Sequence, residues 1–96
     1  MNTSDHSSGI ESLMKERMAL VGELSRANAE LMRALQLVSG LDILQMRDSR
    51  PSENARSRSE ADNRVVVVRR VIDGLESDLM EIDKRMENAM NQESLQ

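Results

Sequence analysis

The chain of 96 residues contains no Trp, Tyr or Phe. Aromatic side chains bury the largest area per residue, so any core must be built from Leu, Val, Ile, Met and Ala. This absence argues against a compact globule with a deep core. Cysteine is also absent, which excludes disulfides, zinc–thiolate sites and cysteine nucleophiles.

Long apolar runs are missing as well. No run approaches the ~20 residues that a membrane-spanning helix needs. The polar stretch from Met1 to Gly9 lacks the hydrophobic region of a secretory signal. We therefore expect one soluble, cytoplasmic domain without a transmembrane segment.

Charged residues make up 31% of the chain and the mean hydropathy is −0.54, as is typical of long helices with one apolar stripe. The charge is uneven. Residues 1–46 carry 4 basic and 6 acidic groups, residues 47–70 carry 7 and 4, and residues 71–96 carry 2 and 7. The basic middle beside an acidic end indicates mutual neutralisation first, and a nucleic-acid or membrane patch second.

The first half predicts a disordered tail over 1–8 and a helix over 9–46. Ser8 and Glu11 have the spacing of a capping box at the helix start. A heptad frame follows, and nine of its ten a and d positions are apolar. These positions are Ile10, Leu13, Arg17, Leu20, Leu24, Ala27, Leu31, Ala34, Val38 and Leu41.

The apolar stripe of this helix is wider than a two-stranded seam. The e positions Met14, Val21 and Leu35 are apolar, and the g positions Glu16 and Glu23 are charged. A wide stripe indicates a helix that touches more than one neighbour, as in a three- or four-helix bundle. Gly40 either ends the helix early or is tolerated within it at a cost of about 1 kcal/mol.

Residues 47–59 predict a polar linker, with four arginines, four serines and the only proline, Pro51. Such a segment buries too little apolar area to offset its ordering entropy. Its arginines could contact phosphates, although interleaved acids and the lack of aromatics argue against nucleic-acid binding. Its serines either cap helices or accept phosphate, which would reverse the charge of the linker. These serines are Ser49, Ser52, Ser57 and Ser59.

A second helix is predicted over 60–91, started by Ser57 or Ser59, with a frayed tail over 92–96. All eight of its a and d positions are apolar. They are Val65, Val68, Ile72, Leu75, Leu79, Ile82, Met86 and Ala89. Four consecutive valines over 65–68 leave a short strand as the alternative there, because valine prefers strands. The unbroken stripe that follows favours a helix.

No catalytic, cofactor-binding or metal-binding residues are predicted. His6, the only histidine, has no evident convergent ligands, and phosphate-loop, hydrolase-elbow and zinc-protease motifs are absent. Carboxylates such as Glu76 and Asp83 are interpreted as a solvated helix face. Arg17 is the only basic residue on the apolar stripe, and a single one does not make an anion site.

The predicted fold class is all-α, with two long amphipathic helices in a coiled-coil hairpin or in a multi-chain helical bundle. Partners are other coiled-coil proteins or further copies of the chain, because two helices of this size bury little area alone. The predicted partner interface comprises Leu13, Leu20, Leu24, Leu31, Leu35, Val38, Val65, Val68, Ile72, Leu75, Leu79, Ile82 and Met86.

Two windows resemble the snapin family of small coiled-coil subunits. The first has Leu20, Glu23, Leu24, Arg26 and Asn28 in a similar order, and the second begins RVVVV at Arg64 and continues through Ile72, Leu79 and Ile82. The resemblance implies a subunit of a hetero-oligomeric helical complex that builds and positions lysosome-related organelles.

The expected function is therefore that of a non-enzymatic scaffold or adaptor subunit of a helical complex, and the resemblance implies a role in vesicle or lysosome-related organelle traffic. A small chaperone that shields a client helix in secretion or assembly is the first alternative. A hairpin that binds RNA or DNA is the second, and it would bind in a salt-sensitive way.

Overall fold

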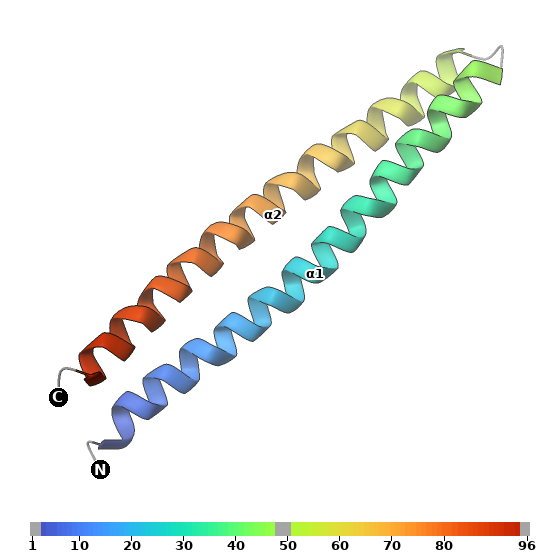
Figure 1. Cartoon of the computed structure of the whole chain (residues 1–96). Coiled ribbons are helices and arrows are strands. Elements are labelled where there is room, and N and C mark those ends of the chain that lie inside the picture. The colour runs from blue at the N-terminus through green and yellow to red at the C-terminus, as the bar shows by residue number, and fades with distance from the viewer. Residues whose placement is uncertain (1–2, 48–50, 95–96) are drawn as a thin grey trace. The chain divides into compact units, whose positions relative to one another are not determined.

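The computed structural model describes residues 3–47 and 51–94, with side chains over 9–47 and 55–92. It contains two helices, α1 (Thr3–Arg47) and α2 (Pro51–Ser94), and no strand within those ranges (Figure 1). The predicted all-α hairpin of two long helices is confirmed. The valine run lies within α2, so the strand alternative is wrong.

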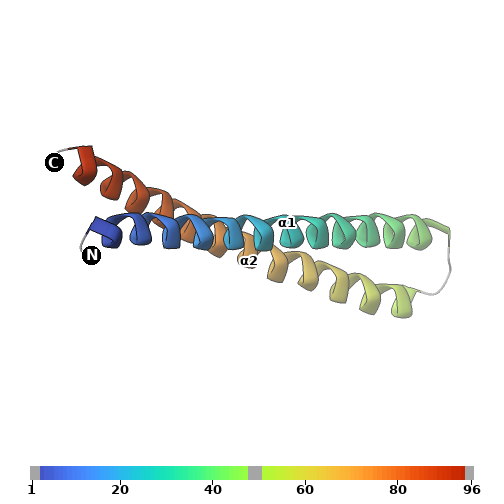
Figure 2. The same cartoon turned by 90° about the horizontal axis from the view of Figure 1, so that it is seen from below.

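The chain is divided into two compact units. The terminal unit comprises Met1–Ser25 with Gly74–Gln96, and the central unit comprises Arg26–Asp73. Each unit contains one segment of α1 and one of α2, which lie side by side and run in opposite directions (Figures 1 and 2). In the central unit, for example, Glu30 pairs with Arg64, whereas Asp42, later in α1, pairs with Arg58, earlier in α2.

The core of each unit follows the predicted heptad register. Every a and d residue named above is buried or half-buried, except Arg17. Three of the six buried residues are alanines, which allow the two helices of a unit to approach closely. The buried residues are Ala27, Ala34, Ala61, Val68, Ile72 and Ile82.

The predicted helix boundaries are wrong by several residues. The helix α1 begins at Thr3, so residues 3–8 are helical and Ser8 lies inside the helix rather than at its cap. Extending an existing helix adds a hydrogen bond for each residue ordered, so a polar stretch can continue a helix that packing stabilises elsewhere. The helix α2 likewise extends to Ser94, and only residues 95–96 of the predicted tail lie outside the described ones.

The predicted linker is mostly helical. Arg47 ends α1 and Pro51 begins α2, while residues 48–50 lie outside the described ranges. Proline suits the first helical position, where its missing N–H would have no partner and its restricted φ is already helical. The heptad pattern also continues backwards from Val65 to Ala61, which is buried, and to Arg58, which is half-buried. The polar composition of 51–59 therefore did not prevent a helix.

Gly40 is tolerated inside α1. A Cβ atom added there would meet no atom within 4 Å. No close approach requires a glycine at this position. The cost of Gly40 is therefore only the larger conformational entropy that glycine loses when the helix forms.

Candidate functional site

The predicted partner interface lies within the chain itself. Its residues are buried or half-buried in the two units, where α1 and α2 cover one another. We refer to the contact between α1 and α2 within each unit as the seam. The surfaces that remain open to a partner are the flanks of this seam. The sequence analysis identified the apolar residues at e positions on these flanks. It did not identify those at b and c positions.

The exposed apolar side chains of the terminal unit share one side of its helices. All five lie at e or b, the positions that follow d and a in the heptad. They are Met14, Met18, Val21, Met80 and Met90. Methionine is flexible and polarizable, so this methionine face adapts to differently shaped surfaces.

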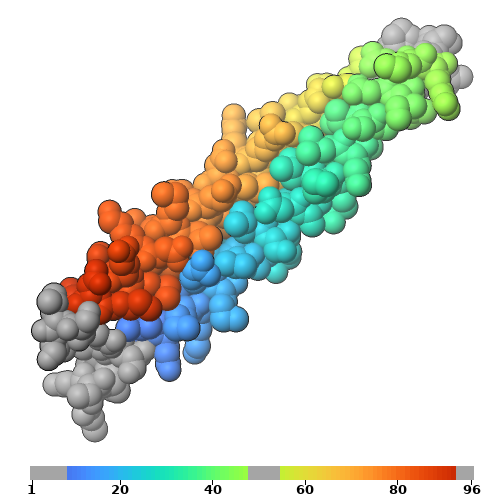
Figure 3. All heavy atoms as spheres, in the orientation of Figure 1, coloured from blue at the N-terminus to red at the C-terminus, as the bar shows by residue number. Residues whose placement is uncertain are grey.

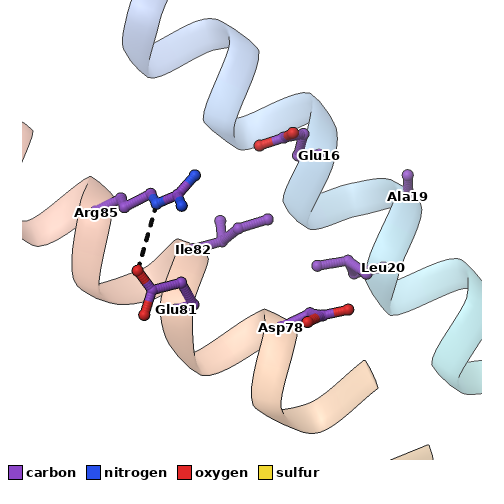
Figure 4. A pocket seen from close by; sticks show the side chains of 7 residues that line it. All are labelled: Glu16, Ala19, Leu20, Asp78, Glu81, Ile82 and Arg85. Atoms are coloured by element: carbon purple, nitrogen blue, oxygen red, sulfur yellow. Dashed lines mark ion pairs between the residues drawn. The ribbon is translucent and has the colours of Figure 1, made fainter. Parts of the chain in front are cut away.

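The opposite flank of the terminal unit is a groove between the helices (Figure 4). Leu20 from α1 and Ile82 from α2 point toward one another and form an apolar floor, and Ala19 lines the groove at its α1 edge. The rim consists of g and c positions and is mainly acidic. It carries Glu16, Asp78, Glu81 and Arg85, with 3.5 Å between Arg85 Nε and Glu81 Oε1. We refer to this site as the acidic groove.

The central unit has two grooves on the corresponding flank. Both contain Leu37 and Arg64, and Arg64 Nη2 donates to Glu30 Oε1 at 3.0 Å. Figure 3 shows the side chains of the two segments meeting along this unit. The grooves are lined by Glu30, Arg33, Ala34, Leu37 and Arg64, and by Leu37, Leu41, Ser57, Glu60, Ala61 and Arg64. Taken together, their acids Glu30 and Glu60 balance their bases Arg33 and Arg64, in contrast to the acidic groove.

Three ion pairs, formed by two arginines, lie on the side of the seam away from the grooves. Arg17 Nε donates to Asp83 Oδ1 at 2.7 Å in the terminal unit, and Arg58 pairs with Asp42 and Asp62 in the central unit. Arg17 is exposed and paired with a carboxylate. It is therefore not an inward-facing anion ligand.

The outer face of α2 in the central unit combines apolar and basic residues. Val66, Val67 and Val71 are 49%, 57% and 50% exposed. Arg69 and Arg70 stand between them in the sequence and are exposed as well. We refer to these five residues as the valine–arginine strip.

No cluster of three or more His, Cys, Asp or Glu side chains that could hold a metal occurs in the described part of the chain. Neither helix, over 3–47 or 51–94, has a segment both long and apolar enough to cross a bilayer. The side chains of His6 and Ser52 and all of Ser49 lie outside those described, whereas Ser57 and Ser59 are exposed within α2.

Comparison of the chain with protein-family models, curated proteins and solved structures finds no match.

Proposed function

We propose that this protein is a non-enzymatic coiled-coil subunit that acts as a scaffold or adaptor in a larger helical assembly. The observation that carries the proposal is the exposure of the methionine face, five large apolar side chains on one side of the terminal unit.

The chemical nature of the uncovered surface supports the same proposal. Among the side chains that the structure describes, thirteen large hydrophobic ones are exposed, on both helices and in both units. Exposed apolar side chains that gather on one side of a protein mark interaction sites. Long helices offer such patches to other helices, because side chains repeating every 3.5 residues interdigitate along a shared seam.

The resemblance to the snapin family supports a setting in vesicle or lysosome-related organelle traffic, in the cytoplasm, with other coiled-coil proteins as partners. The methionine face supports a second candidate, a chaperone that shields one client helix, because methionine-rich surfaces accommodate varied partners. A chaperone would form a 1:1 complex with its client, whereas a scaffold subunit would assemble stably with several coiled-coil proteins.

The test is co-purification of the tagged chain from its native cells, with the masses of the complexes measured by light scattering. The variant Met18→Glu/Val21→Glu places negative charge on the methionine face, and Ser12→Glu/Lys15→Glu places it on the outer face of the same helix, less than two turns earlier. We expect the first pair to release partners and the second to retain them. Folded chain that stays monomeric and retains no helical protein would refute the proposal.

A further inference from the structure

The two units of the chain carry opposite net charges. The terminal unit has 4 basic and 10 acidic residues, a net charge of −6, and the central unit has 9 basic and 7 acidic residues, a net charge of +2. Contact between the terminal units of two copies would bring like charges together. Contact between the terminal unit of one copy and the central unit of another brings opposite charges together, which attract.

The valine–arginine strip gives the central unit a surface suited to this arrangement. Val66 and Val67 stand one helical turn before Arg70, so the three side chains are neighbours on the surface of α2. Neither Arg69 nor Arg70 forms an ion pair with any described side chain, and Asp73 is the one acid within a turn of both. The strip therefore offers short branched apolar groups together with two basic groups open to acids from outside.

The acidic groove of the terminal unit has the complementary chemistry. Its floor is made by Leu20 and Ile82, and the small side chain of Ala19 at the α1 edge leaves room for branched residues from a partner. Glu16 and Asp78 stand on its rim, and neither is paired within the described part of the chain. The floor is apolar like the valines, and the acidic rim carries the charge opposite to that of the arginines.

We propose that the occupant of the acidic groove is the valine–arginine strip of a second copy of this chain. Each chain carries both surfaces, so each copy offers a strip and accepts one from another copy. This inference rests on the proposed function and names its partner.

The test uses charge reversal in the full chain, with dissociation constants measured by sedimentation equilibrium at low ionic strength. Arg69→Glu/Arg70→Glu and Glu16→Arg/Asp78→Arg should each weaken self-association at least tenfold. The two variants mixed together should recover association with one another, since their surfaces then carry reversed but matching charges. Circular dichroism of each sample checks that it remains helical.

The control reverses two other arginines of the central unit. Arg26→Glu/Arg56→Glu makes the same change in net charge on exposed positions outside the strip, and it should weaken association less than threefold. Equal weakening by control and strip variants would overturn the docking mode and leave the proposed function standing. A wild-type chain that is helical yet monomeric up to millimolar concentration would also overturn it, and co-purification would then decide the proposed function alone.

A second measurement serves if a reversal variant does not fold. The chain has no cysteine, so a chain with Ala19→Cys and another with Val67→Cys carry one thiol each. Under mild oxidation the mixture should form the mixed disulfide between the two variants, several times faster than a mixture of Lys15→Cys with Val67→Cys. Equal rates in the two mixtures would refute the placement of the strip in the groove.

Discussion

The substitution Ile72→Ala tests whether the seam between the helices stabilises the fold. Ile72 is 8% exposed at an a position of the central unit, while Ile43 of the same unit is 54% exposed. The same change, Ile43→Ala, is therefore a matched control. Neither residue belongs to the valine–arginine strip or lines a groove.

The expected effects follow from how much of each side chain is covered. Isoleucine to alanine removes three carbons, worth about 2.4 kcal/mol when fully buried at ~0.8 kcal/mol each. Scaled by burial, this gives about 2.2 kcal/mol for Ile72 and about 1.1 kcal/mol for Ile43. Alanine's higher helix propensity returns about 0.4 kcal/mol at both sites. Any cavity left at Ile72 destabilises the protein further. We therefore expect the free energy of unfolding to fall by about 2–3 kcal/mol in Ile72→Ala and by less than 1 kcal/mol in Ile43→Ala.

Thermal and urea unfolding followed by circular dichroism, at one protein concentration, measures both variants. For a domain of this size 1 kcal/mol corresponds to roughly 4–8 °C in Tm. Ile72→Ala should therefore lower Tm by about 10–20 °C, and Ile43→Ala by about 5 °C or less. Equal losses would show that the two sites are equally covered, which would refute the assigned seam.

Three further predictions concern other parts of the chain. Ser57→Pro should destabilise the protein by about 3 kcal/mol in urea unfolding, because Ser57 lies inside α2. Ser57→Ala is the control, and a proline variant as stable as this control would show that the segment around Ser57 is an irregular linker. Gly40→Ala should raise stability by about 0.5–1 kcal/mol, because the added Cβ meets no atom within 4 Å, and a loss measured in the same assay would contradict the open space. A double-mutant cycle of Glu30→Ala with Arg64→Ala should give a coupling of about 0.2–1 kcal/mol that falls with added salt, because both side chains are substantially exposed; a salt-independent coupling of several kcal/mol would contradict this.

The sequence determined the fold class and the heptad register. Strict spacing of apolar residues, from Leu13 to Leu41 and from Val65 to Ala89, leaves one face of each helix to bury. The burial of Ala34, Val68 and Ile82 follows that spacing. Such patterns survive in any context, because a helix repeats every 3.6 residues whatever it packs against.

The helix ends and the uncovered surfaces were decided by the tertiary structure. Composition predicted a linker over 47–59, yet Arg58 and Ala61 continue the seam and Arg58 pairs with Asp42, which lies far away in the sequence. Local propensity is too weak to place a helix end when contacts with another helix add to it. The same contacts cover the a and d residues within the chain. The acidic groove and the valine–arginine strip therefore become visible only after the two helices of each unit have paired, because pairing determines which flanks remain open to a partner.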